Sequence, residues 1–261
     1  MRQLYLVPNR SELKQLAELR RTYGAKWEYN DFFLPSVLDD RKAQLEIINT
    51  YAKEIGDFAG DTIHGAFLDV TLHSTDRLIR EVSELRVRQS MDIAKEMGVR
   101  GVVFHTGRLY NFRDETYLNN WLNTNESFFR RMLEEYPDTE IYMENMFDES
   151  SDMMARLGER MKDADRFGIC LDYAHARVYG TEEATWFREL APYVKHMHIN
   201  DNDGRNDLHQ AVGAGICGWQ QFNQLMEEYE IHSSILVEVS GYEKQKCSLE
   251  FMEKNHVIPF D

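Results

Sequence analysis

Short apolar runs alternate with longer amphipathic stretches along the chain. The runs are rich in β-branched and aromatic residues, which is typical of buried β-strands. They lie at residues 3–7, 25–30, 61–67, 101–106, 140–145, 168–173, 194–200 and 234–239. The stretches between them, such as 11–23 and 74–98, have helical periodicity, and several begin with a Ser, Thr or Asp that can cap a helix. Because helical crossovers join parallel strands, the pattern predicts a parallel sheet.

Two architectures contain a parallel sheet of this kind. Eight strands in a chain of 261 residues match a (β/α)8 barrel, in which the strands close into a ring surrounded by helices. The rival is a doubly wound open sheet, which normally has a glycine-rich phosphate turn after its first strand, and the segment LYLVPNRSE has no glycine. No repeat or Pro/Gly-rich linker divides the chain. We therefore predict an α/β fold with a single domain, a (β/α)8 TIM barrel over residues 1–261.

The composition indicates which binding partners and which cellular compartment to expect. The chain has 30 basic and 45 acidic residues, a formal charge of −15, which disfavours nucleic acid as a partner. Nucleic acid is not excluded, because divalent cations bound at an acidic site would reverse the local potential. Cys170, Cys217 and Cys247 have no CxxC spacing, so we expect a reducing, cytoplasmic location. No run of about 18 apolar residues is present, so we expect no membrane span.

The strongest functional signal is that several predicted strands end in carboxylates or imidazoles. Glu144, Asp172, His198 and Glu238 end the last four strands. A closed barrel of parallel strands brings such side chains to one mouth. Three carboxylates and one imidazole suit a divalent ion such as Mn²⁺, Zn²⁺, Co²⁺ or Mg²⁺. One acidic strand end is more often a solvated terminus, but four in succession favour a shared metal site.

Five further residues are potential ligands near the same mouth. His64 and His105 end the third and fourth strands, His175 follows Asp172 by three residues, and the long loop 200–218 carries Asp207 and His209. They could hold one or two further ions, bind substrate hydroxyls or phosphate, or support the ligands of the first ion. We expect one ion, and at most three.

A set of motifs, taken in order, resembles the xylose isomerase-like barrel superfamily. The segments are IHGAF, VVFHTGR, YMEN, CLDYAHA, HMHIND, DLHQAVGAGICGW and LVEVSG, so the resemblance covers most of the chain from residue 60 onward. The superfamily includes sugar and sugar-phosphate isomerases and epimerases, inosose dehydratases and the AP endonucleases of the endonuclease IV group. The resemblance implies that the four strand-end residues match the single metal centre of the isomerases and epimerases. The five further residues fall where the endonuclease IV group places the other ligands of its three-zinc cluster.

Two functions follow from these residues and the resemblance. The primary hypothesis is a divalent-metal-dependent sugar or sugar-phosphate isomerase or epimerase. Glu144 and Glu238 would exchange a proton as base and acid through a metal-stabilised enediolate. The alternative is an endonuclease IV-like, zinc-dependent AP endonuclease or phosphodiesterase, in which Glu144 bridges metals. The segment HGAFLD favours the nuclease, whereas the acidic balance and the absence of a basic residue in WEYNDFF favour sugar chemistry. A third possibility is a barrel that binds metal but has lost its reaction; the full set of ligand-type residues argues against it.

We expect a small carbohydrate as the substrate. Glu28 and Asn30, at the end of the second strand, are predicted to bind sugar hydroxyls, and His175 or His209 to anchor a remote hydroxyl or phosphate. An apolar wall for the sugar ring could come from Trp27, Phe32, Phe33 and Trp219.

The remaining histidines and the oligomeric state complete the expectations. His196 is predicted to pack inward or to support a ligand, and His73, His232 and His256 to be exposed. A homo-oligomer is compatible with the resemblance, since related barrels often associate, although no apolar stripe in the sequence demonstrates an interface.

Overall fold

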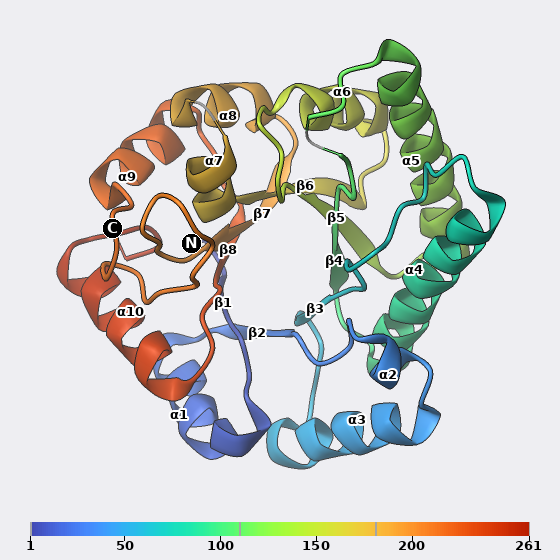
Figure 1. The fold of residues 1–261 in the computed structure, drawn as a ribbon. Coiled ribbons are helices and arrows are strands. Elements are labelled where there is room, and N and C mark those ends of the chain that lie inside the picture. The colour runs from blue at the N-terminus through green and yellow to red at the C-terminus, as the bar shows by residue number, and fades with distance from the viewer. Residues whose placement is uncertain (1, 110, 181, 261) are drawn as a thin grey trace.

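The computed structural model describes residues 2–109, 111–180 and 182–260. In this part of the chain eight parallel strands pair in sequence order, and β8 pairs with β1 to close a barrel. The strands are β1 (Leu4–Leu6), β2 (Lys26–Tyr29), β3 (Thr62–His64), β4 (Gly101–His105), β5 (Glu140–Glu144), β6 (Phe167–Asp172), β7 (Val194–Ile199) and β8 (Ser234–Val237). Figure 1 looks into the ring. The predicted (β/α)8 barrel is confirmed.

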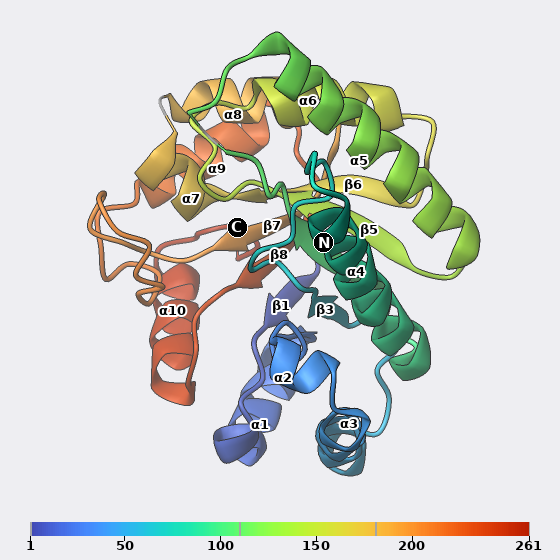
Figure 2. The ribbon, with the colours of Figure 1, turned by 45° about the vertical axis from the view of Figure 1, so that its right-hand side comes forward.

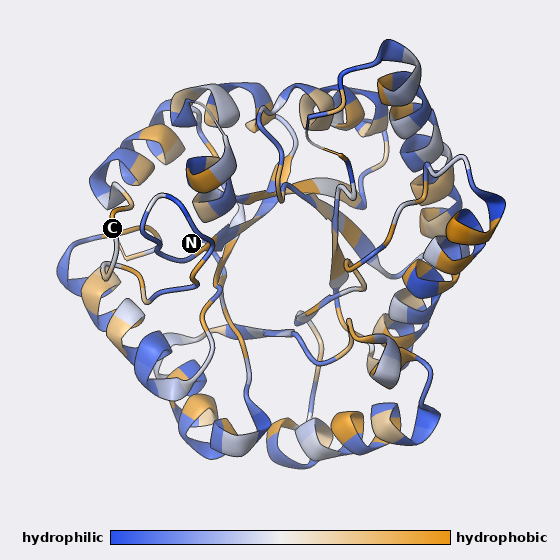
Figure 3. Ribbon diagram, viewed as in Figure 1, coloured by the Kyte–Doolittle hydropathy of each residue, from blue (hydrophilic) through white to orange (hydrophobic). Residues whose placement is uncertain are grey.

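Helices form an outer layer around the strands (Figures 1 and 2). They are the short 3-10 helix η1 (Arg10–Glu12) and the α-helices α1 (Leu13–Tyr23), α2 (Pro35–Leu38), α3 (Arg41–Ile55), α4 (Arg77–Met97), α5 (Glu115–Glu135), α6 (Asp152–Met161), α7 (Tyr173–Tyr179), α8 (Glu183–Leu190), α9 (Trp219–Glu228) and α10 (Tyr242–Lys254). Hydrophobic and hydrophilic residues alternate along them in Figure 3, as expected for helices with one face on a sheet.

Local signals explain where the longer helices begin and end. Asp40, Asp76 and Asp114 cap α3, α4 and α5, and each carboxylate accepts a backbone N–H of the first turn. Gly24 and Gly98 end α1 and α4 with φ of 61° and 69°, the left-handed conformation that glycine adopts at little cost. The capping pattern anticipated from the sequence is therefore present.

Helix α4 illustrates how the outer layer packs. Val87, Met91 and Ala94, at helical spacing, are buried, and each large apolar side chain removed from water contributes roughly 1.5–3 kcal/mol. On the side toward α5, Arg88 pairs with Glu135. Apolar burial therefore holds α4 in place, and exposed ion pairs of this kind add little.

All eight predicted strands exist, but most are shorter than their apolar runs. The run 61–67 forms a strand only over Thr62–His64. Gly65 then approaches Phe104 so closely that a Cβ would lie 2.3 Å from a ring carbon. The chain leaves the sheet at that point and turns toward the mouth of the barrel, where His64 is the last paired residue.

Polar side chains occupy part of the barrel interior. Tyr142 stacks on His196 with ring centroids 5.4 Å apart, and Tyr5 meets the same imidazole edge-on at 5.2 Å. His198 lies above them, toward the carboxyl ends of the strands. No helix in the described residues is long and apolar enough to cross a membrane.

Candidate metal centre

The strands β3 to β8 and the segments that follow them bring the nine predicted ligands to one mouth of the barrel. Within the described residues they form three groups, and in each group the donor atoms lie within 4.8 Å of one another. The groups are His64, His105 and Glu144; Glu144, Asp172, His198 and Glu238; and His175, Asp207 and His209. The strand register contributes directly, because His105 pairs with Glu144 and Asp172 pairs with His198 across neighbouring strands. The first two groups share Glu144.

The first group places two imidazoles close together. The Nε2 atoms of His64 and His105 lie 3.0 Å apart, and they are 3.5 and 3.2 Å from Glu144 Oε2. His64 Nδ1 lies 3.0 Å from the Gly65 carbonyl, which assigns its proton to Nδ1 and leaves a lone pair on Nε2. Burial lowers the pKa of His105. A pair of imidazoles beside a carboxylate is a donor set that suits a divalent transition metal.

The second group contains buried carboxylate oxygens that form no hydrogen bond. Both Glu144 oxygens, Asp172 Oδ2, Glu238 Oε2 and His198 Nδ1 have no hydrogen-bond partner. His198 Nδ1 lies 3.2 Å from Glu144 Oε1 and 3.4 Å from Glu238 Oε2. Burial raises the pKa of Asp172 to about 7. Three buried carboxylates and one imidazole with donor atoms within 4.8 Å of one another fit a bound divalent cation.

The third group is built around Asp207. Its Oδ2 lies 3.2 Å from His175 Nε2 and 3.1 Å from His209 Nε2. The other ring nitrogens contact backbone carbonyls, His175 Nδ1 at 2.8 Å from Asn145 O and His209 Nδ1 at 2.9 Å from Glu238 O. These carbonyls orient both rings so that Nε2 is turned toward Asp207. Metal-binding histidines usually have this arrangement, in which the second ring nitrogen donates to a carbonyl or carboxylate.

The loop that carries Asp207 and His209 is held by a residue that sequence reasoning missed. Asp201 is fully buried; its Oδ1 accepts the Cys217 N–H at 2.9 Å, and its Oδ2 accepts the Gly213 N–H at 2.9 Å. The only signal for this role was an acidic residue shortly after the HMHIN strand. Asp201 therefore ties the start of the ligand-bearing loop to its end.

Two predicted substrate contacts need correction. Trp219 packs against Tyr173 in the core and donates its indole N–H to Asp201 Oδ2 at 3.0 Å, so it does not line the cavity at the metal centre. Glu28 is fully buried beneath the centre. Its Oε1 lies 3.0 Å from His198 Nε2, and its Oε2 accepts the Thr62 hydroxyl at 2.7 Å. Glu28 supports a ligand instead of facing a substrate, because its side chain points into the barrel.

His196 shares this lower layer. Its Nε2 lies 3.2 Å from Glu28 Oε2, and its Nδ1 contacts the Ser234 hydroxyl at 2.7 Å. Of the two expected roles of His196, inward packing is confirmed, and its hydrogen bond goes to Glu28 and not to a predicted metal ligand.

A cavity of about 400 Å³ opens beside the three groups. Asn30 lines it, and the buried Oδ1 atom of its side chain has no hydrogen-bond partner. Phe33 also lines it and contacts Phe67 with ring centroids 5.1 Å apart, whereas Trp27 and Phe32 are fully buried in the core. The lining comprises Val7, Asn30, Phe33, His64, Phe67, His105, Met146, His175, Asp207, His209, Glu238, Ser240 and Lys244. Ser240 and Lys244 were not predicted: Ser240 lies within the LVEVSG motif but was given no role, and Lys244 lies outside the motifs.

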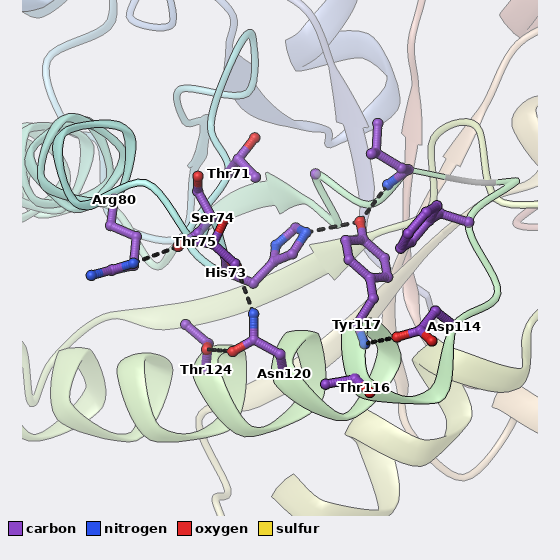
Figure 4. Close-up of a pocket in the computed structure, with 13 residues that line it drawn as sticks. Thr71, His73, Ser74, Thr75, Arg80, Asp114, Thr116, Tyr117, Asn120 and Thr124 are labelled. Atoms are coloured by element: carbon purple, nitrogen blue, oxygen red, sulfur yellow. Dashed lines mark hydrogen bonds between the residues drawn. The ribbon is translucent and has the colours of Figure 1, made fainter.

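A larger cavity, of about 970 Å³, lies between the start of α4 and the face of α5 and holds none of the predicted ligands (Figure 4). His73 lines it, although it was expected to be exposed; it is 4% exposed and contacts the Tyr117 hydroxyl at 2.8 Å. Burial lowers the pKa of His73 to about 4, and Arg108 adds to the effect. His232 and His256 are exposed, as expected. Because the His73 ring and Asn120 are bonded within the cavity wall, we assign the chemistry to the smaller cavity.

Comparison with known proteins agrees with this geometry. Residues 30–255 match the family model described as xylose isomerase-like TIM barrel. The chain belongs to this family. It is 26% identical over 204 residues to a probable endonuclease 4 of Aquifex aeolicus, a match that covers 70% of the chain and 71% of the relative. In six of the curated relatives that it matches, the matched part ranges from 53% to 73% of the relative's length.

Two solved structures share the fold over nearly the whole chain. A Thermus thermophilus protein soaked with ZnCl2 superimposes with a TM-score of 0.75 at 22% identity, covering 96% of both chains. A D-tagatose 3-epimerase-like protein has a TM-score of 0.73 at 19% identity, covering 97% of this chain and 96% of the other. At these identities the likeness establishes the fold alone.

Proposed function

We propose that this protein is a metal-dependent phosphoesterase that hydrolyses a phosphodiester bond with up to three divalent cations, zinc being the best fit. The observation that carries the proposal is the third donor group. A single-ion isomerase does not need His175, Asp207 and His209 as metal ligands. Backbone carbonyls nevertheless orient both imidazoles with Nε2 toward Asp207, as in a further metal site. The similarity to proteins named as endonucleases supports the same chemistry. The proposal therefore prefers the alternative of the two sequence-based hypotheses.

The three groups would hold the cations, with Glu144 shared between the first two. Zinc accepts this mixture of imidazole and carboxylate donors. When bound, such a cluster lowers the pKa of water to supply a hydroxide nucleophile and stabilises the charge on the leaving oxygen.

The side chains have separate tasks in this scheme. Asp172 Oδ1 accepts the His175 backbone N–H, so only Oδ2 is turned toward the centre. Glu28 keeps His198 oriented from below. Phe33 and Phe67 form an apolar wall that limits water beside the reacting group. These residues orient donors and exclude water.

An isomerase or epimerase remains the second candidate because one observation favours it. Glu144 and Glu238 both flank His198 and present oxygens without hydrogen-bond partners, as a base and acid pair acting on one carbon would require. The epimerase-like structures share the fold, which permits this chemistry without selecting it.

One experiment separates the candidates. The zinc-loaded protein is assayed for metal content, for cleavage of bis(4-nitrophenyl) phosphate and an abasic-site duplex, and for solvent deuterium incorporation into ketoses and ketose phosphates. We expect about three zinc ions per chain and phosphodiester cleavage. In Asp207→Ala one ion and most cleavage should be lost, whereas the control His232→Gln, at an exposed histidine, should behave as wild type. One ion per chain, no cleavage of either phosphodiester and rapid deuterium exchange would replace the proposal with the isomerase.

A further inference from the structure

The cavity beside the metal centre has two unlike halves. All nine predicted ligands come from β3 to β8 and the segments that follow them. The other half is lined by Val7 and Asn30 from the segments after β1 and β2, and by Ser240 and Lys244 from the segment after β8. This half contains none of the predicted metal ligands, so it is the space available to the part of a substrate that does not react.

Lys244 brings a positive charge to this half. Among the described residues that line the cavity, it is the only lysine or arginine. Its Nζ donates to the His209 carbonyl at 3.1 Å, and within the described residues it forms no ion pair with a carboxylate. An ammonium group has three donors, so hydrogen-bonding capacity remains for an anion.

Three arginines on the mouth loops differ from Lys244 because acidic residues already neutralise them. Arg10 pairs with Asp31 at 3.0 Å, and Arg108 pairs with Asp148 at 3.0 Å. Arg113 pairs with Glu149. The contrast singles out Lys244 as a cation that stands at the cavity without a carboxylate partner in the described part of the chain.

The neighbouring residues suit a sugar. Asn30 offers a buried Oδ1 without a partner, which can accept a hydroxyl proton, and Ser240 presents an exposed hydroxyl. Phe33 supplies an aromatic ring to the lining of the same cavity. A ring with hydroxyl groups and an attached anion would use all of these features.

The loops that surround the cavity at the barrel mouth favour a small substrate. Leu34, Leu68 and Phe147 are 42–50% exposed on the loops that follow β2, β3 and β5. The middle of a nucleic-acid duplex presents many phosphates, and binding it requires several free cations. A rim with exposed apolar side chains, on which Arg10, Arg108 and Arg113 are already paired, is poorly matched to such a surface, whereas a single ammonium group matches a single phosphate.

We propose that Lys244 and Ser240 form a subsite for a second, non-reacting phosphate of the substrate, while Asn30 and Phe33 hold the sugar that carries it. The inference rests on the proposed phosphoesterase function and narrows its substrate class to small sugar or nucleotide phosphodiesters that carry an additional phosphate. Lys244 is then a specificity residue and contributes to binding, not to the reaction.

The test uses a matched pair of substrates. Thymidine 3′-(4-nitrophenyl phosphate) is compared with the same compound phosphorylated at the 5′ hydroxyl, using the zinc-loaded protein. We expect the wild type to prefer the phosphorylated compound, mainly through KM, and added salt to weaken the preference. Lys244→Gln should reduce this preference about tenfold, the effect of one hydrogen bond to a charged group, and Lys244→Arg should retain most of it. The control Lys246→Gln, whose lysine lies on the same helix within 3.9 Å of Glu250, should keep the full preference.

Each remaining outcome has a defined meaning. An unchanged preference in Lys244→Gln overturns the subsite. Equal slowing of both substrates with loss of zinc also overturns it, because Lys244 would then act only by holding the His209 loop. If no protein cleaves either compound, the phosphoesterase function fails and calorimetry decides the subsite separately. Thymidine 5′-monophosphate, but not thymidine, should then bind wild type about tenfold more tightly than Lys244→Gln, and equal binding to both proteins would refute it.

Discussion

The two ends of the barrel treat their buried polar groups differently. At the amino end, Asp61 is fully buried but accepts the Trp27 N–H at 2.9 Å and the Tyr29 hydroxyl at 2.8 Å. Arg100 and Glu140 pair there at 3.0 Å. At the carboxyl end, Glu144 is equally buried, yet neither of its oxygens has a hydrogen-bond partner. Burial raises the pKa of Glu144, but the imidazoles of His198 and His105, each 3.2 Å from one of its oxygens, outweigh burial and hold that pKa well below its usual value. The first end pairs its groups through hydrogen bonds, whereas the second gathers groups that can bind a metal.

The difference shows how to separate a structural polar cluster from a functional one. Burial alone does not distinguish Asp61 from Glu144, since both are inaccessible to water. The identity of the partners does distinguish them, because Asp61 accepts a backbone N–H and a tyrosine hydroxyl, whereas Glu144 lies among imidazoles that are themselves potential metal ligands. The amino end therefore supplies stability, and the carboxyl end offers donors to a metal.

Removing the buried carboxylate at one end or the other of the barrel gives the largest expected effects. Glu144→Gln should reduce metal-dependent activity by more than about a hundredfold, because it removes a donor shared by two groups. Added zinc should raise the unfolding temperature of the wild type more than that of Glu144→Gln, because the variant binds the cations less tightly. Activity assays, metal analysis and thermal unfolding with and without zinc test both halves of the statement.

The matched change at the amino end should do the opposite. Asp61→Ala leaves the Trp27 N–H and the Tyr29 hydroxyl without their acceptor, which should lower the free energy of unfolding by about 2–4 kcal/mol. Zinc content and activity per folded molecule should stay near wild type. If zinc raises the unfolding temperature of Glu144→Gln as much as that of the wild type, the contrast between the ends is wrong.

The layer beneath the centre gives an intermediate effect. Glu28→Gln keeps the shape of the side chain but removes the charge 3.0 Å from His198 Nε2. We expect the affinity for the ion of the second group to fall roughly ten- to hundredfold, the usual effect of losing a partner behind a ligand. Competition with a chromogenic chelator measures it. The exposed Glu250→Gln serves as the control, and an equal fall in both variants would exclude a specific role for Glu28.

The sequence predicted the features that local pattern determines. Strand runs and helix caps recur at regular intervals, and a residue at the end of a parallel strand must reach the mouth, so His105 and Glu144 were predictable as neighbours. The direction of a side chain near a strand end was less predictable. Glu28 and Asn30 lie two residues apart, yet one is buried beneath His198 and the other lines the cavity, because the strand has ended between them.

Roles that depend on tertiary packing were missed. Trp219 looked like a sugar-binding aromatic residue, but the buried Asp201 carboxylate takes its only side-chain N–H donor. His73 looked exposed, but α5 places Tyr117 over it. Lys244 carries no motif, and its position at the cavity follows from the start of α10. In each case the partner is distant in sequence, so no periodicity could reveal it.

The smallest expected effect is the pH dependence of zinc binding at the carboxyl end of the barrel. Burial raises the pKa of Asp172 to about 7, so the metal-free folded protein holds this proton more tightly than the unfolded chain does. As pH rises through 7, the metal-free protein should lose stability, while zinc affinity should gain about tenfold per unit below pH 7 as one proton is displaced. Burial lowers the pKa of His209, but Glu238 and Asp207 outweigh it and raise that pKa to about 10, so the third group should continue to gain affinity up to that pH. Asp207→Ala should remove this upper part of the profile and leave the step near pH 7. In Asp207→Ala, where the contribution of the third group is removed, a zinc affinity that is flat between pH 6 and 7 would mean that Asp172 is already ionised without metal.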